Sequence, residues 1–137
     1  MIVVIRDYKK NDRFALMCLS DDEWKLQVIS TVMSLKESGE IEKCLVAESD
    51  GAIVGFIYGF ILPNKTLIPE FMYVKPNARK NGVGTELLRQ LEICSDCTAS
   101  MVFYNKALHS YYKKQGYQAG DNLEVAMKEI GGSCNEV

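Results

Sequence analysis

The sequence contains a single histidine and no long apolar run, and both shortages narrow the classes of protein that it fits. With His109 as the only imidazole, the pair Cys94-x-x-Cys97 lacks the two further ligands that a zinc site needs at suitable spacing. No stretch approaches the roughly 20 apolar residues of a transmembrane helix. The first residues also lack the apolar block and cleavage site of a signal peptide. We therefore expect a cytoplasmic protein without a bound metal and without membrane contact.

An excess of basic residues and a set of paired cysteines are also missing. The chain has 16 Lys and Arg against 18 Asp and Glu, a net charge of −2, and so lacks the basic surplus of nucleic-acid-binding proteins. Its five cysteines are an odd number spread over 137 residues, unlike the disulfide frameworks of small secreted domains. Cys94 and Cys97 fall at the expected end of a helix, whereas a redox-active thiol is normally found at a helix start. No nucleic-acid partner and no disulfide framework are expected.

The residues that are present suffice for one packed domain. The composition, 47% hydrophobic and 25% charged, is typical of globular proteins. Apolar spacing predicts helices over 9–19, from Trp24 to near Gly39, over 83–94 and from Asn105 to Gly116. It predicts strands over 2–6, 43–48, 52–61, 66–74, 98–103 and 123–127. The order β-α-α-β-β-β-α-β-α-β indicates an α+β fold, a mixed sheet flanked by helices, in a single domain over residues 1–137.

Local signals mark the second helix and the hairpin that follows it. Ser20 and Glu23 have the spacing of a capping box before the helix. Asp50-Gly51 is a favoured two-residue hairpin turn, because both positions adopt positive φ. Gly55 and Gly59 inside the next strand indicate a bulge or a close backbone approach. An amphipathic stripe at spacings of three and four runs along the helix through Trp24, Val28, Thr31, Val32 and Leu35.

The segment from Arg79 to Thr85 lies between a predicted strand and a predicted helix, where backbone amides without an internal partner favour an anion. Gly82 and Gly84 would let the backbone approach a diphosphate, and Arg79 and Lys80 add positive charge. The segment matches neither the P-loop, which needs Gly-Lys-Ser/Thr, nor the dinucleotide fingerprint, whose third glycine is replaced by Leu87. It does satisfy [QR]-x-x-G-x-[GA] through Arg79, Gly82 and Gly84.

Residues 72–88 resemble the acetyl-CoA motif of the GNAT superfamily, in which a strand ending in Val-x-Pro leads into R-x-x-G-x-G and an amphipathic helix. Residues 105–117 are similar to the later family signature N-x-x-A-x-x-x-Y-x-x-x-G-[FY]. Asn105, Tyr112, Gly116 and Tyr117 are in register, and Leu108 replaces the usual small residue. The likeness extends from about residue 43 to residue 127, with both motifs in the family's order.

The resemblance implies a mostly antiparallel sheet with splayed central strands and acetyl-CoA as co-substrate. The backbone of Met72 and Val74 would pair with the pantetheine arm, and the amides of 81–85 with the Arg79 side chain would hold the diphosphate. Asn105 would bond the cofactor near its pantetheine end, while a plain helix-capping role explains it as well. The expected cofactor-binding residues are Met72, Val74, Arg79, Lys80, Asn81, Gly82, Val83, Gly84, Thr85 and Asn105.

The implied reaction is direct attack of a primary amine on the thioester. The Val74 N–H would stabilise the oxyanion, and Tyr112 would protonate the departing thiolate. Glu70, which strict alternation places on the strand face of Met72, would deprotonate the amine through water. Each residue also has a structural interpretation. Tyr112 fits a half-buried core tyrosine, and Glu70 fits a surface ion pair with a basic residue.

The acceptor itself is not identified by these motifs. Acidic residues in and after the first two helices suggest a cationic amine, although a solvated helix face explains the same charges: Asp21, Asp22, Glu23, Glu37, Glu40 and Glu42. A catalytically silent acyl-CoA-binding regulatory or interaction domain is the alternative function. Because dimers are common in the family, a homodimer is among the partners that the resemblance implies.

Overall fold

The computed structural model describes residues 2–39, 43–120, 126 and 128–131. Of the predicted last strand, over 123–127, only residue 126 is described, and Glu40 and Glu42 also lie outside the described residues. The chain divides into two compact units, Met1–Phe103 and Tyr104–Val137.

The first unit contains most of the regular structure. Its elements are β1 (Val4–Asp7), a 3₁₀ turn (Lys10–Asp12), α1 (Arg13–Met17), α2 (Glu23–Glu37), β2 (Lys43–Ser49), β3 (Ala52–Ile61), β4 (Thr66–Val74), a second 3₁₀ turn (Pro76–Ala78), α3 (Val83–Cys94) and β5 (Ala99–Ser100). The second unit contains a 3₁₀ turn (Lys106–Leu108) and α4 (His109–Lys114).

The sheet has five strands in the order β1-β2-β3-β4-β5. The first four are antiparallel to their neighbours, whereas β5 runs parallel to β4 and pairs with it only through Thr66↔Ala99 and Leu67↔Ser100. This mixed, mostly antiparallel sheet in an α+β unit is the predicted architecture. The last described strand is much shorter than the predicted 98–103.

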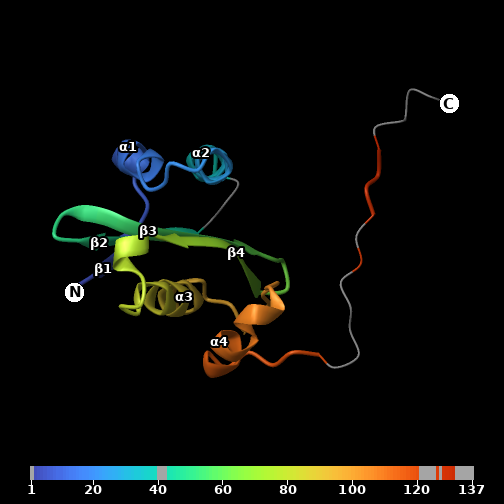
Figure 1. The fold of residues 1–137 in the computed structure, drawn as a ribbon. Helices are drawn as coiled ribbons and strands as arrows, with labels where there is room; N and C mark the ends of the chain where they lie inside the picture. Colours follow the sequence, from blue (N-terminus) through green and yellow to red (C-terminus); the bar gives the residue numbers. More distant parts are fainter. Residues whose placement is uncertain (1, 40–42, 121–125, 127, 132–137) are drawn as a thin grey trace. The chain divides into compact units, whose positions relative to one another are not determined.

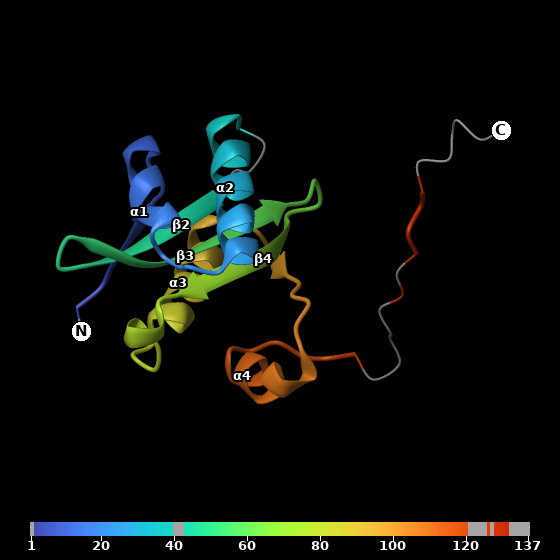
Figure 2. The same cartoon turned by 45° about the horizontal axis from the view of Figure 1, so that its top comes forward.

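Helices cover both faces of this sheet (Figures 1 and 2): α1 and α2 lie on one face and α3 lies on the other. On the α2 face, Ile29 and Val32 are buried with Phe56 and Tyr73 from the central strands. On the α3 face, the buried side chains include Leu87 and Leu91. The sheet is therefore enclosed at its centre, and β4 has one face against each helix layer.

Two glycines of β3 allow α3 and β4 to come close. A Cβ at Gly55 would lie 2.9 Å from the Tyr73 carbonyl oxygen, and one at Gly59 would lie 2.9 Å from that of Ile68. Both positions would also contact leucine side chains of α3 at 3.3–3.4 Å. The predicted close backbone approach is confirmed, because any side chain would collide with the neighbouring strand.

The hairpin turn is also confirmed, since Asp50 and Gly51 have φ of 51° and 78°. The start of α2 agrees with the prediction to within a residue, but the predicted capping box of Ser20 and Glu23 is wrong. The N-cap of α2 is Asp22, whose carboxylate accepts a 3.0 Å hydrogen bond from the Lys25 amide. The Ser20 hydroxyl instead accepts from the Asp22 amide at 3.1 Å, which forms a turn two residues before the cap.

An ion network holds β1 to its surroundings. Arg6 binds both carboxylate oxygens of Asp12 at 2.8 Å and an oxygen of Glu48 at 2.9 Å. Asp12 is buried and also accepts from the Lys9 amide at 2.8 Å. The Arg6 hydrogen bond, above all, lowers the pKa of Asp12, so this carboxylate is ionised at neutral pH.

Across the described ranges, no helix combines the length and the apolarity required to cross a bilayer. No group of three His, Cys, Asp or Glu side chains in the same ranges is placed to hold a metal ion. Cys94 is the last residue of α3, as predicted, and both it and Cys97 are free thiols. Burial raises the pKa of Cys94, which disfavours the reactive thiolate.

Candidate functional site

Among the described residues of the first unit, the edge of β4 opposite β3 pairs with another strand only at Thr66 and Leu67, and the rest is called the open edge of β4. The Lys75 amide donates to the Val54 carbonyl at 2.8 Å, which fixes the alternation of backbone groups along the end of β4. In an antiparallel pair, the N–H and C=O of alternate residues point to the same side. Those of Met72 and Val74 therefore point away from β3, toward the side on which β5 pairs only with Thr66 and Leu67. An extended molecule can add to such an edge as a further strand.

A bulge in β4 changes the position expected for Glu70. The register passes from Tyr58↔Phe71 to Gly59↔Pro69, so Glu70 is an extra residue without a partner in the register. The alternation along the strand is broken there, and the prediction that Glu70 shares the face of Met72 is wrong.

Contacts before and after the bulge show the change of face, because Leu67 and Met72, an odd number of residues apart, both lie toward α3. A Cβ at Gly59 would lie 3.2 Å from Cδ1 of Leu67 and 3.3 Å from Cδ2 of Leu91 in α3. Met72 packs against Gly84 of α3, whereas Phe71 packs on the core beneath α2. Burial chiefly, and the negative charge of Glu70 in addition, raise the pKa of Tyr58, which also belongs to the core beneath α2.

The segment that follows β4 delivers the chain to the start of α3. Lys80 and Gly82 both have positive φ, 66° and 77°, and Gly82 is the N-cap of the helix. Glycine has no side chain to accept from the first helical amides, those of Val83 and Gly84 among them. A Cβ at Gly82 would meet nothing within 4 Å, so this turn faces open space. The helix dipole adds positive potential at the same point, which makes an anion site.

Gly84 has a packing role that sequence reasoning did not predict. A Cβ at this position would lie 3.2 Å from Cε and 3.4 Å from Sδ of Met72. The missing side chain therefore lets α3 pack closely on β4. A Cβ at Gly84 would thus meet a neighbouring side chain, whereas one at Gly82 would not.

Arg79 and Asn81 shape the loop. The Arg79 Nε atom donates to the Val74 carbonyl at 2.8 Å, and its guanidinium lies 5.4 Å from the centre of the buried Tyr73 ring. Lys25 of α2 places its ammonium 5.2 Å from the same ring.

The Asn81 side-chain amide donates to the carbonyls of Ala78 and Arg79 at 3.3 and 3.1 Å. Two cations thus lie near the end of β4, and the turn before Gly82 is closed by side-chain hydrogen bonds.

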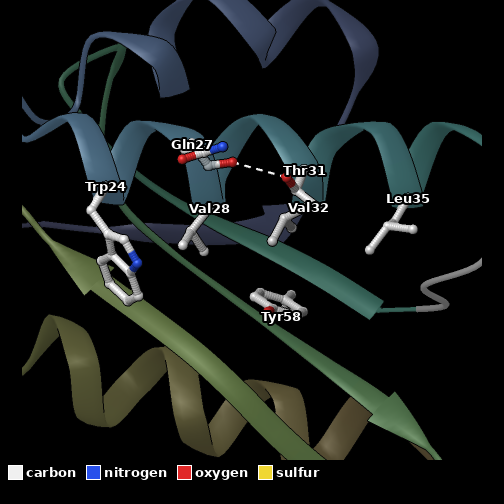
Figure 3. Close-up of a pocket in the computed structure, with 7 residues that line it drawn as sticks. All are labelled: Trp24, Gln27, Val28, Thr31, Val32, Leu35 and Tyr58. Atoms are coloured by element: carbon white, nitrogen blue, oxygen red, sulfur yellow. Dashed lines mark hydrogen bonds between the residues drawn. The ribbon is translucent and has the colours of Figure 1, made fainter. Parts of the chain in front are cut away.

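A cavity of about 310 Å³ lies between α2 and the sheet (Figure 3). Figure 3 shows Val28, Val32 and Leu35 pointing from α2 toward the sheet, with the Tyr58 ring below them. Trp24 is 64% exposed at one end, where its ring meets that of Phe71 edge-on at 6.3 Å. Sequence reasoning identified the stripe as one face of an amphipathic helix and did not predict a cavity or the part of Tyr58 in it, because periodicity alone does not distinguish a packed contact from a void.

The acidic residues of the α2 region have other roles. Asp22 caps α2, and Glu37 accepts hydrogen bonds from Tyr8 at 3.0 Å and from Arg13 at 3.3 Å. Among the acids expected to attract a cationic amine, the four that the structure describes, Asp21, Asp22, Glu23 and Glu37, do not line the cavity.

In the second unit, the Asn105 side chain accepts from the Ala107 amide at 2.9 Å and caps the turn before α4. Tyr112 lies in an aromatic cluster, with ring centres 4.6 Å from Tyr104, 5.1 Å from Tyr111 and 5.7 Å from Tyr117. Burial raises the pKa of Tyr112, and its tyrosine neighbours add to the effect. The phenol is therefore protonated at neutral pH.

The predicted site residues divide between the two units. The first brings Glu70, Met72 and Val74 onto one strand that continues directly into the turn at 79–85. Asn105 and Tyr112 belong to the second. The first unit thus offers, in chain order, a strand edge for an extended group and a helix start for an anion.

A family profile described as "Acetyltransferase (GNAT) domain" matches residues 40–119 of this chain. One curated relative, L-2,4-diaminobutyric acid acetyltransferase of Virgibacillus pantothenticus, is 46% identical over 52 residues. That match covers 36% of this chain and 33% of the relative, so the alignment spans about a third of the relative's length.

Solved structures resemble the whole fold. The PaiA N-acetyltransferase of Thermoplasma acidophilum, in complex with coenzyme A, aligns with a TM-score of 0.69 at 20% identity, covering 89% of this chain and 93% of that one. A GNAT family acetyltransferase of Brucella melitensis, in complex with acetyl-CoA, also gives 0.69 at 17% identity, covering 86% and 84%. At these identities the likeness concerns the fold.

Proposed function

The chain belongs to the GNAT acetyltransferase domain family, and we propose that it transfers an acetyl group from acetyl-CoA to a primary amine of a small acceptor. The observation that carries this proposal is the continuity of the open β4 edge with the start of α3. Acetyl-CoA is a thioester on an amide-containing arm that ends in a diphosphate. The arm and the diphosphate of acetyl-CoA therefore follow one another in the same order as the β4 edge and the start of α3 do along the chain.

Each part of the cofactor has a proposed partner in the first unit. The amides of the pantetheine arm pair with the backbone of Met72 and Val74, as an added strand does. The diphosphate accepts from the amides of the turn up to Thr85, with Arg79 and Lys80 supplying charge. The two solved relatives from Thermoplasma and Brucella, which hold coenzyme A and acetyl-CoA, support this choice of co-substrate.

The proposed reaction is a direct transfer. The amine nitrogen attacks the thioester carbon, and the Val74 N–H donates to the oxyanion that forms. The C–S bond then breaks, and the thiolate leaves with the bonding electron pair. The proton lost by the amine passes through water to Glu70, and the thiolate takes a proton from Tyr112. Because the phenol holds its proton at neutral pH, Tyr112 is available as the acid.

We also propose that the two units form one acetyltransferase domain, with Asn105 contacting the arm of the cofactor. The family match supports this, because residues 40–119 extend across the boundary between Phe103 and Tyr104. The capping bond of Asn105 uses the side-chain oxygen and leaves the amide nitrogen as a donor for the cofactor.

The test is a thiol-release assay with acetyl-CoA and a panel of primary amines, run on the parent, Tyr112→Phe and Glu70→Gln. The proposal predicts amine-dependent thiol release that falls about 100-fold in each variant, a typical contribution of one acid or base. Coenzyme A at 100 times its Kd should stabilise the parent by about 2.7 kcal/mol. Stabilisation without thiol release on any amine would instead indicate the silent acyl-CoA-binding domain.

A further inference from the structure

Resting on the proposed function, we infer that the acceptor is a primary amine on a flat apolar body, such as an arylalkylamine. The body enters the cavity between α2 and β3, and the amine lies toward Glu70. This assigns a substrate class to the site, which the family as a whole does not specify.

The lining of the cavity is neutral and mostly apolar. Trp24, Val28, Val32 and Leu35 contribute hydrocarbon or aromatic surface, and among the described residues the Tyr58 phenol is the one ionisable group in the lining. The Thr31 hydroxyl already donates to the Gln27 carbonyl at 3.0 Å. A sugar or a polyamine would leave hydroxyl or ammonium groups without partners here, which is unfavourable.

Aromatic rings continue from the cavity to the reacting strand. The Phe71 ring lies 6.3 Å from Trp24 and 6.4 Å from Tyr58, within the range of favourable ring contacts. Phe71 is also the residue between Glu70 and Met72, so a ring in the cavity lies beside the strand that is proposed to hold the thioester. The exposed indole of Trp24 at the rim is suited to cover a flat ligand.

The volume agrees with one small ring system. A cavity of about 310 Å³ lies at the lower end of ligand-pocket sizes. One aromatic ring system with a short chain fits this space, whereas an aminoglycoside of several rings does not.

The charges around the cavity favour a single amine. Glu70 is the neighbour in sequence of Phe71, whose ring lies near those of Trp24 and Tyr58 in the lining, and its carboxylate would attract one ammonium group before deprotonation. Farther along β4, Lys25 and Arg79 both lie near the Tyr73 ring, at 5.2 and 5.4 Å from its centre. A second ammonium group directed toward the cofactor end would meet these two cations.

The experiment compares acceptors and cavity variants in the thiol-release assay. Tryptamine and 2-phenylethylamine are measured against putrescine, L-2,4-diaminobutyrate and kanamycin. The inference predicts kcat/KM at least about tenfold higher for the arylalkylamines, since transferring a buried ring from water is worth more than about 1.4 kcal/mol.

Val28→Phe fills the cavity and should raise KM for the arylalkylamine at least about tenfold, with the Kd of coenzyme A unchanged. Trp24→Ala changes an exposed position that folding tolerates. It should also raise KM for the arylalkylamine, because it removes the ring that covers the ligand at the rim of the cavity, and it should leave the Kd of coenzyme A unchanged. Ser34→Phe is the matched control, because Ser34 is exposed on the same helix and lies outside the lining.

Faster turnover of a diamine or of kanamycin, or a KM for the preferred amine that neither cavity variant changes, would overturn the inference and leave the acetyltransferase proposal intact. Absence of thiol release with every amine, together with absence of coenzyme A binding, would overturn both. The two failures are therefore distinguished by the same set of measurements.

Discussion

The Nε atom of Arg79 donates a 2.8 Å hydrogen bond to the carbonyl oxygen of Val74. This bond joins the loop before α3 to the open edge of β4, so the two parts of the proposed cofactor site are held by one side chain. The guanidinium also lies near the Tyr73 ring, which limits its movement.

Arg79→Lys tests whether the geometry or the charge of this side chain matters. Lysine keeps the charge but has no planar guanidinium to bond Val74 and contact the ring together. We predict that the Kd of coenzyme A, measured by calorimetry, rises about tenfold in Arg79→Lys, the equivalent of one charge-assisted hydrogen bond. Arg79→Met removes both the charge and the guanidinium. An unchanged Kd of coenzyme A in both variants would show that neither the charge nor the geometry of Arg79 contributes to binding.

Gly82→Ala is predicted to weaken coenzyme A binding about tenfold or more. A Cβ at this position has open space, but the φ of 77° is strained for alanine by about 1–2 kcal/mol. The turn should relax and move the first α3 amides away from the diphosphate.

Gly39→Ala is the matched control for that variant. Gly39 follows α2 and has φ of 82°, and a Cβ added to it would also meet nothing within 4 Å, so both substitutions introduce the same strain. Thermal denaturation should show similar losses of stability, while calorimetry should show weaker binding in Gly82→Ala alone. Equal binding by the two variants would contradict the anion site at the start of α3.

Tyr112→Phe is predicted to lower kcat about 100-fold and to alter the alkaline limb of the pH profile. An acid must hold its proton, and burial raises the pKa of Tyr112 above the ordinary value of about 10. The parent should therefore keep its acid form through mildly alkaline pH and lose activity only as the pH rises through that raised pKa. Steady-state kcat against pH checks this. A parent-like kcat in Tyr112→Phe would assign the tyrosine to packing alone.

Asp12→Asn is predicted to lower the free energy of unfolding by about 1–3 kcal/mol at neutral pH. The Arg6 hydrogen bond lowers the pKa of Asp12 in the folded state, so its stabilising effect is present above the unfolded pKa of about 3.9. That effect is lost as the pH falls through the lowered folded pKa. Urea denaturation should thus show a large difference in the free energy of unfolding between parent and variant at pH 7. The difference should be small once the pH is below the lowered pKa of Asp12. A difference independent of pH would exclude the ion pair as its cause.

Sequence reasoning succeeded where structure is determined by neighbouring residues. The Asp50-Gly51 turn was predicted from its need for left-handed backbone, and both residues have positive φ in the structure. The strands 43–49, 52–61 and 66–74 were predicted to within a residue, because long apolar runs bounded by turn residues leave few alternatives.

Errors arose where distant contacts decide the outcome. The bulge at Glu70 depends on how β4 pairs with β3, and no local signal in residues 66–74 announces the shift of register. The same is true of Gly84, whose absent side chain accommodates Met72 of a neighbouring strand. The choice between Ser20 and Asp22 as the cap of α2 was ambiguous in sequence, since both residue types are good N-caps.

The cavity beneath α2 could not have been predicted from periodicity. Trp24, Val28 and Leu35 have the spacing of an ordinary core stripe, and only their separation from the sheet shows that part of that face is unfilled. Its pairing with Tyr58 depends on the packing of α2 over β3, which residue spacing does not determine.

The most direct test of the account is an NMR titration of the backbone amides with coenzyme A, with pantetheine, which lacks the diphosphate, as the control. With coenzyme A, we predict the largest changes in amide chemical shift at the turn from Gly82 to Thr85 and along Met72 to Val74. With pantetheine, we predict changes only along Met72 to Val74. Unchanged amides at 82–85 under saturating coenzyme A would contradict the claim that the start of α3 holds the diphosphate.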